Sequence, residues 1–375
     1  MSTATDLKKS ELLDRATQLA VARKGSGGPP SGEVGDLIRA YYRHIGADDL
    51  AERTDVDLYA ALASQFRLAD NRPQGRANVH VSTPSHADSG WSAGGHSVIE
   101  IVTDDMSFLV DSVTMELARQ QREIHLVVHP QFDVVRDITG VLEGVHPIKD
   151  ESKPPAEGAI RESWMHIEIS RLGIDEDPAT LEEAIQKVLR EVRDSVEDWD
   201  KMRAQAREIV EELTSAPPPL DAVQIERGRA FLTWLADDHF AFLGYREYHL
   251  EREGDDEILR AVPGTGLGIL RADQDQSRAF AKLPEAAKAK AREKTLLVLS
   301  KANSRATVHR PAYLDYVGVK TFDENGEVKG ERRFPACCPA RRTRSRSPAS
   351  RCCGRRPPTC WRGSASSRTA TRARA

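Results

Sequence analysis

Cysteine is absent from the first 334 residues of this 375-residue chain, and all five cysteines lie between Pro335 and Ala375. A fold stabilised by disulfide bonds is therefore excluded for those 334 residues. No apolar run approaches the ~18 residues needed to cross a bilayer, and no charged-then-apolar leader opens the chain. These absences predict a cytoplasmic protein that has no membrane partner.

Acidic residues and lysine are absent from the last 41 residues, which contain eleven arginines. All 58 acidic residues therefore precede Pro335, together with 43 of the 54 basic residues, so the first 334 residues carry a net charge of −15. Such an acidic body argues against nucleic acid as a partner.

Residues 335–375 show no helical or strand period and consist mainly of Arg, Ser, Pro, Cys, Ala and Thr. A disordered basic tail and an RNA-binding Arg/Ser segment are two interpretations of this composition. A third is translation in the wrong reading frame, because codons for CCPARRTRSRS, shifted by one base, can encode LLSSAAYTESV. We therefore expect a disordered, off-frame tail without a function of its own.

Apolar residues recur at helical spacing in residues 1–75, which we expect to form an N-terminal helical region. Residues 76–215 follow a strand–helix–strand–strand–helix order with trailing helices. This order predicts an α+β fold, a ferredoxin-like sandwich with helices on one face of an antiparallel sheet. In SWMHIEIS (163–170) the alternation predicts that Met165, Ile167 and Ile169 form the buried face.

Residues 222–334 are expected to form a second, incomplete α+β domain. A polar segment at 277–294 is expected to be an exposed helix, and Asn325-Gly326 to turn a tight hairpin. The strand that should follow Phe334 is expected to be missing, which would leave a sheet edge unpaired there.

Motifs that would carry chemistry are weak. Gly264, Gly266 and Gly268 lack the spacing and the strand–turn–helix context of a dinucleotide loop. His125 and His129 would pair on a helix, but the β-branched residues between them favour a strand that separates the rings. The sequence singles out no catalytic residue, no cofactor-binding residue and no metal ligand.

Two segments remain as candidate ligand contacts. Asp104 and Asp105 precede a helix, where they are expected to cap its first turn or, alternatively, to contact a small molecule. Arg305 and Arg310 lie in a segment that would suit an anion, although solvated charges at a strand edge are the simpler interpretation.

Four long strings resemble, in order, the N-terminal region of the large NAD-specific glutamate dehydrogenases: DMSFLVDSVTMELARQQREIHLVVHPQFDVVRD (105–137), ESWMHIEISR (162–171), FLTWLADDHFAFLGYREYHL (231–250) and VHRPAYLDYVGVKTFDENGEVKGERRF (308–334). In that family the GERRF string continues with a strand resembling LGLFTSAAYTESV, which the shifted reading of the tail fits. The resemblance therefore supports a frameshift after Phe334.

The resemblance implies that residues 76–215 are an ACT-like domain and residues 222–334 a PAS-like one, both outside the catalytic region. It implies an assembly or regulatory fragment of an enzyme that converts L-glutamate to 2-oxoglutarate with NAD, homo-oligomeric in its full-length form and open to a small-molecule effector. The fragment is expected to bind no cofactor and to be inactive alone. The alternative is a stand-alone ACT-like module that senses an amino acid.

Overall fold

The computed structural model describes residues 4–23, 33–150, 152–253, 256–271, 280–282 and 292–337. The chain divides into two compact units, Met1–Glu197 with Arg305–Ala312, and Asp198–Ser304 with Tyr313–Ala375. The tail expected at 335–375 lies outside the described residues from residue 338 onward, and disorder is wrong for residues 335–337, which belong to a strand. The domain boundaries drawn from the sequence stay a proposal.

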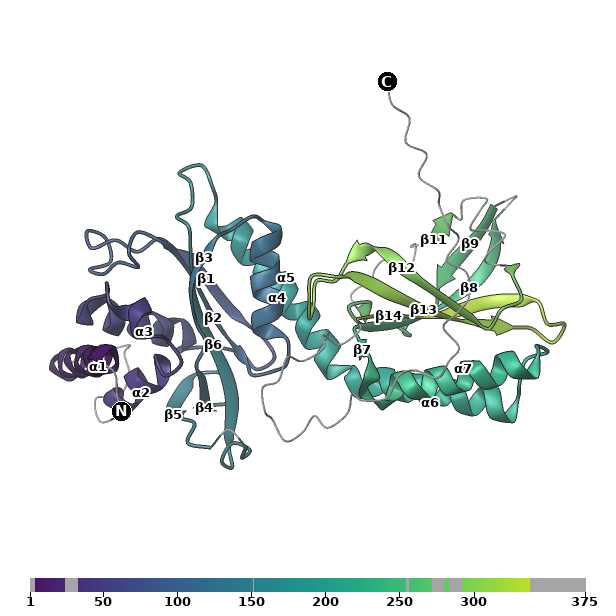
Figure 1. Cartoon of the computed structure of the whole chain (residues 1–375), viewed down its shortest axis with the longest axis horizontal. Coiled ribbons are helices and arrows are strands. Elements are labelled where there is room, and N and C mark those ends of the chain that lie inside the picture. Colours follow the sequence, from purple (N-terminus) through teal and green to yellow (C-terminus); the bar gives the residue numbers. More distant parts are fainter. Residues whose placement is uncertain are drawn as a thin grey trace, which may run out of the picture. The chain divides into compact units, whose positions relative to one another are not determined.

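The first unit combines helices with a six-stranded antiparallel sheet (Figure 1). Its elements are α1 (Ala4–Ala22), α2 (Val34–Tyr41), a 3-10 turn (Asp48–Leu50), α3 (Asp55–Ala69), β1 (Asn78–Ser82), β2 (Ser97–Asp104), α4 (Leu109–Arg119), β3 (Ile124–Val128), β4 (Gln131–Arg136), β5 (Leu142–Pro147), β6 (Ala159–Ile169) and α5 (Pro178–Glu197). From β2 to α5 the order is strand, helix, four strands and helix, so the predicted first strand and the two helices are confirmed, but the sheet has two more strands between the helices than expected.

Strand order in this sheet is β1-β2-β6-β4-β5, and β3 pairs with the other half of the same β6 edge. In a ferredoxin-like sandwich a fourth strand follows the second helix and pairs beside the first strand. Here β1, which precedes β2 in the chain, pairs antiparallel with β2 at that position. The backbone N–H of Val81 in β1 donates to the carboxylate of Glu182 on α5, at 2.7 Å.

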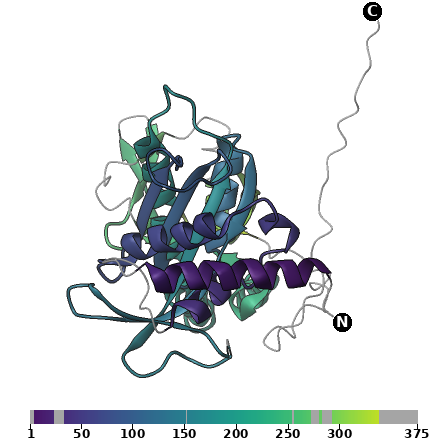
Figure 2. The same cartoon turned by 90° about the vertical axis from the view of Figure 1, so that its left-hand side faces the viewer.

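Both faces of the sheet are covered, which corrects the expectation that only one face of β6 is buried. Met165, Ile167 and Ile169 are buried as expected, but Trp164 on the opposite face is also fully buried. Trp164 packs edge-to-face against Phe66 of α3, with ring centroids 5.0 Å apart. Figure 2 shows α1 and α3 lying across this face, and Figure 1 shows α4 and α5 on the other side of the sheet.

The second unit is also built from helices and an antiparallel sheet, in the order β11-β9-β8-β14-β13-β12, with β10 beside β8 and β7 beside β14. Its elements are α6 (Trp199–Ser215), α7 (Ala222–Trp234), a π turn (Leu235–His239), β7 (Ala241–Phe242), β8 (Gly244–Glu253), β9 (Asp256–Ala261), β10 (Leu267–Gly268), β11 (Phe280–Lys282), β12 (Leu297–Arg305), β13 (Tyr313–Phe322) and β14 (Val328–Cys337). The expected hairpin turn is confirmed, and Gly326 has φ +75°.

The expected unpaired edge at Phe334 is wrong. Phe334 pairs with Val317 of β13 inside strand β14, which continues to Cys337 and also pairs with β7 and β8. Its ring is fully buried between those of Phe242 and Tyr245, at centroid distances of 5.2 and 4.8 Å. Strand β14 lies between β8 and β13, which both precede it in the chain. Its pairing on both sides therefore does not depend on a later segment.

The helix expected at 277–294 lies mostly outside the described residues. Phe280–Lys282 within it form strand β11, which pairs with Ile258–Arg260 of β9. For these three residues the helix prediction is wrong. Their backbone groups pair with those of β9, and this pairing outweighs the local helical preference of the segment.

Candidate ligand-binding sites

Asp104 and Asp105 do not cap helix α4, contrary to expectation. Phe108 adopts the left-handed conformation, φ +74°, and the helix begins at Leu109 without a side-chain cap. Asp104 instead accepts from Arg72 at 2.6 Å and pairs with Arg193 at 2.7 Å. Residues 106–108, with the left-handed turn at Phe108, separate the aspartates from the first turn of α4. Their carboxylates therefore do not accept from the free N–H groups of the helix.

Asp105 lines a hollow of about 320 Å³ at the strand-to-helix loop, formed by residues 105–111 with His129 and Gln131. The carboxylate of Asp105 accepts from Nε2 of Gln131 at 3.0 Å. Burial lowers the pKa of His129, although Asp105 opposes that effect, and the ring also contacts the hydroxyl of Ser163. The hollow thus combines a carboxyl side chain with a histidine whose protonation is disfavoured by burial.

The structure brings the second candidate segment against the same loop. The backbone N–H of His309 donates to Ser112 at 3.1 Å, and the His309 ring lies 4.8 Å from the ring of Phe108. Arg305 is exposed and Arg310 is half-buried. Neither arginine lines the hollow, and an anion site between the two side chains stays a prediction.

A buried charge network joins the sheet to the chain after α3. The side chains of Arg72 and Glu162 are both fully buried and lie 2.6 Å apart. Arg136 also pairs with Glu162, at 2.6 Å, and the indole N–H of Trp164 donates to it at 2.9 Å. Because each charged side chain here has an oppositely charged partner, we assign this network to stability rather than to ligand binding.

A second buried cluster surrounds Glu168 on the same face. Glu168 contacts Arg53, Nδ1 of His96 at 3.3 Å and Nε2 of His166 at 3.4 Å. Burial alone would raise the pKa of Glu168, but bonding to His166 and the charge of Arg53 outweigh it and lower that pKa. The ring of His96 also stacks on that of His125 at 4.0 Å.

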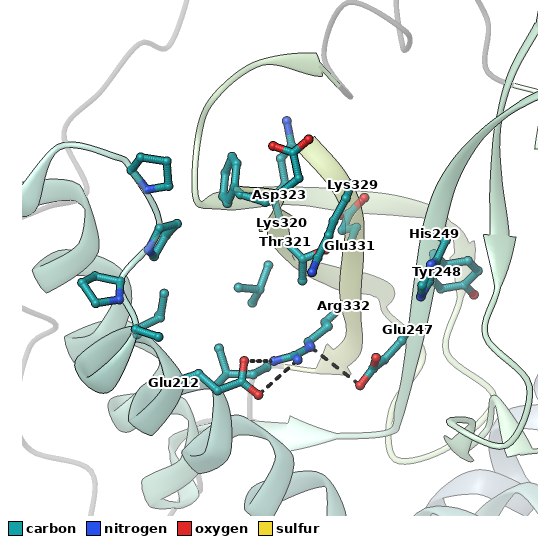
Figure 3. A pocket seen from close by; sticks show the side chains of 18 of the residues that line it. Glu212, Glu247, Tyr248, His249, Lys320, Thr321, Asp323, Lys329, Glu331 and Arg332 are labelled. Atoms are coloured by element: carbon teal, nitrogen blue, oxygen red, sulfur yellow. Dashed lines mark hydrogen bonds and ion pairs between the residues drawn. The ribbon is translucent and has the colours of Figure 1, made fainter. Parts of the chain in front are cut away.

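The second unit contains a larger cavity, of about 700 Å³, between the end of α6 and the sheet (Figure 3). Strands β8, β13 and β14 form its floor, and Pro217–Pro219 form one wall. Arg332 of β14 lies between two carboxylates: it bonds both oxygens of Glu212, at 2.6 and 3.1 Å, and its Nε lies 3.7 Å from Glu247.

Charges around this cavity depend on one another. Burial alone would lower the pKa of Arg332, but Glu212, Tyr245 and Glu247 raise it above its ordinary value. Burial raises the pKa of Tyr245, and its hydroxyl donates to Glu247 at 2.6 Å, which raises it further. Arg332 therefore lies among acidic side chains, in a cavity that Lys320, Lys329, Asp323, Glu324 and Glu331 also line.

Sequence analysis missed both the Glu168 cluster and this cavity. Glu168 and His166 alternate with apolar residues, which signals a strand but gives no hint of what covers the polar face. Glu212, Glu247 and Arg332 lie far apart in the chain. Each resembles an ordinary solvated charge, and only the fold brings them together.

Among the described residues, no group of three or more His, Cys, Asp or Glu side chains could hold a metal ion. In the same part of the chain, no helix combines the length and apolar character that membrane crossing requires.

Comparison with known proteins identifies one family. Residues 37–185 match the family described as "Glutamate dehydrogenase, ACT1 domain". An NAD-specific glutamate dehydrogenase from Halomonas elongata is 34% identical over 318 residues, which cover 80% of this chain and 19% of that protein. Similar relatives are those of Pseudomonas aeruginosa, 34% identical over 295 residues, and Mycobacterium tuberculosis, 28% over 276. They cover 78% and 73% of this chain, but only 18% and 16% of those relatives. The chain thus spans about a fifth of the length of these relatives.

Proposed function

Because this chain belongs to the NAD-specific glutamate dehydrogenase family and carries its ACT1 domain, we propose that it is the non-catalytic N-terminal part of such an enzyme. Its role would be assembly and regulation, within a longer protein that oxidatively deaminates L-glutamate to 2-oxoglutarate with NAD. The chain itself would bind no NAD and would be inactive alone.

One observation carries this proposal: 80% of the chain aligns with a relative, but the alignment covers only 19% of that relative. The part that matches a named domain is an ACT1 domain rather than a dehydrogenase domain. We further propose that the full-length protein is a cytoplasmic homo-oligomer, and that Asp105 contacts a small-molecule effector in the strand-to-helix hollow. Asp104, Arg305 and Arg310 receive no role in this proposal.

The segment from Pro335 is proposed to be out of frame. Resequencing the DNA around the codons for Phe334 and Pro335 tests this directly. A single-base change should restore a frame that continues through a dehydrogenase domain. An unchanged sequence, together with a cellular product of the mass of 375 residues, would contradict the proposal.

An activity assay separates the proposed function from its rivals. The 375-residue chain should form no NADH from L-glutamate and NAD, whereas the continuous in-frame product should form it. NADH formation by the 375-residue chain would contradict the proposal.

A stand-alone amino-acid sensor remains the second candidate, favoured by the hollow at Asp105. It requires a genome in which no dehydrogenase domain follows this reading frame.

A further inference from the structure

The cavity of about 700 Å³ in the second unit has no part in the function proposed above. Its volume lies within the range of pockets that take small molecules, roughly 300–1,000 Å³. Its lining combines basic, acidic and apolar side chains: Arg332, Lys320 and Lys329, then Glu212, Glu247, Asp323, Glu324 and Glu331, and then Ile209, Leu213 and Val319. Together they restrict the chemistry of what would fit.

Arg332 provides the cationic part of the cavity. Its side chain is 18% exposed, and both of its terminal nitrogens donate to Glu212. Among the described residues its Nε has no hydrogen-bond partner, because Glu247 lies at 3.7 Å. A guanidinium has five N–H donors, so Arg332 retains donors for a ligand carboxylate.

The carboxylates form the anionic part. Glu247 keeps one oxygen that no hydrogen bond occupies among the described residues, since Tyr245 donates only to Oε1. Helix α6 ends at Ser215, and Ala216 lines the cavity, so the carbonyl end of the helix adds a partial negative charge. An ammonium group is favoured beside these groups.

Between the charges lies an apolar surface. Ile209, Leu213 and Val319 are buried side chains that line the cavity, as do Pro217–Pro219. Consecutive prolines are stiff, so this wall loses little entropy when a ligand binds. An apolar side chain would bury its surface here.

We propose that this cavity binds a small zwitterion with an apolar side chain, an α-amino acid in chemical class. Its carboxylate bonds Arg332 and its ammonium group bonds Glu247. The inference does not rest on the proposed function, because binding is measured on the 375-residue chain and requires no catalytic domain.

Calorimetric titration of the full chain with L-valine, L-methionine and L-phenylalanine tests the class. At least one should bind with a Kd below about 1 mM, the level of a weak but specific small-molecule complex. For the tightest binder, two analogues follow, the amine without the carboxylate and the acid without the amino group. Each should bind at least about tenfold more weakly, a loss near 1.4 kcal/mol. No binding by any of the three amino acids, or equal binding by an analogue, would overturn the proposal.

Two variants locate the site. Arg332→Gln should weaken the amino acid at least about tenfold and leave the amine unchanged. Glu247→Gln should weaken the amino acid and the amine but not the deaminated acid. If Arg332→Gln fails to fold, Arg332→Lys tests the contact with the ligand carboxylate. Glu247→Gln tests the contact with the ligand ammonium group.

Arg260→Gln is the matched control, because Arg260 pairs with Glu251 at 2.6 Å in the same sheet but outside the cavity. Its affinity should equal that of the unaltered chain. Binding that survives both cavity variants, or that Arg260→Gln weakens equally, assigns the ligand to another place and refutes the proposal.

Discussion

The two units place arginine–glutamate pairs in opposite settings. In the first, Arg72 and Glu162 are both fully buried, with Arg136 as a second cation. In the second, Arg332 and Glu212 are 18% and 48% exposed at a cavity. A buried charge that loses its partner is costly, whereas a pair in contact with water is worth little. The same two residue types therefore hold one unit together and leave the other open to a ligand.

Removing one arginine from each pair tests this contrast most strongly. Arg72→Met should lower the free energy of unfolding by about 3–5 kcal/mol, because Glu162 keeps its burial and loses a cation. Arg332→Met should cost under about 1 kcal/mol, since water replaces the lost partner of Glu212. Urea denaturation of both variants measures the difference. Equal losses would show that burial does not separate the two pairs.

Two hairpin glycines offer the next comparison. Gly140, between β4 and β5, has φ +95°, and a Cβ there would lie 2.5 Å from the backbone oxygen of Arg72. Gly326, between β13 and β14, has φ +75°, and its Cβ would meet only the ring of Pro219, at 2.8 Å.

Gly140→Ala should therefore lower the free energy of unfolding by about 2–3 kcal/mol and Gly326→Ala by about 1–2 kcal/mol. The backbone of Arg72 can shift less than the ring of Pro219 to relieve the close contact. Thermal unfolding of both variants measures the order. A reversed order would mean that the Arg72 carbonyl can move without loss.

Acid sensitivity should come from Asp198 of the second unit. Burial alone would raise its pKa, but bonds from Arg271, the Gly268 backbone and Lys201 lower it from 3.8 to about 2. A depressed carboxyl pKa stabilises the fold above the unfolded value of about 3.8, and this contribution, about 2 kcal/mol, is lost as pH falls towards 2. Asp198→Asn should flatten the dependence of the free energy of unfolding on pH between 4 and 2.

Glu176 of the first unit is the comparison for that titration. The paired Arg122 and the Gly173 backbone lower its pKa to about 2 as well, but its carboxylate is solvent-exposed. Glu176→Gln should change the pH dependence far less than Asp198→Asn does. A larger effect from Glu176 would contradict the weight given to burial.

Helix caps should give the smallest effect. Thr54 forms a reciprocal capping box with Asp57 at the start of α3, whereas Asp221 accepts a single backbone N–H at the start of α7. Thr54→Ala should cost about 1–2 kcal/mol and Asp221→Ala about 0.5–1 kcal/mol. Urea denaturation of the two variants should return that order, and a larger loss from Asp221→Ala would contradict it.

Local patterns predicted most of the first unit. The β-branched run Val98–Thr103 located β2, alternation located β6, and helical spacing located α5, because each of these patterns is local to its element. The second buried face of β6 was not predictable, because its cover comes from α1 and α3, far upstream. The start of α4 was misjudged because an apolar run continues through Phe108 while its backbone turns to positive φ.

In the second unit, the sequence predicted the hairpin at Gly326 but not the cavity beside it. Turn chemistry is local, and Asn-Gly carries it in two residues. A cavity depends on how α6 packs on strands more than thirty residues later. Its charges are indistinguishable in sequence from those on any wet surface.

The position of β1 has a consequence for where this polypeptide can be cut. Residues 83–96 connect β1 to the next strand, so proteolysis in that stretch would separate β1 and the three helices before it from the rest of the sheet. The remainder would present an unpaired β2 edge and an uncovered sheet face that carries Val102, Phe132 and Trp164, both prone to self-association. Protection of this stretch from proteases would therefore report whether the first unit is intact.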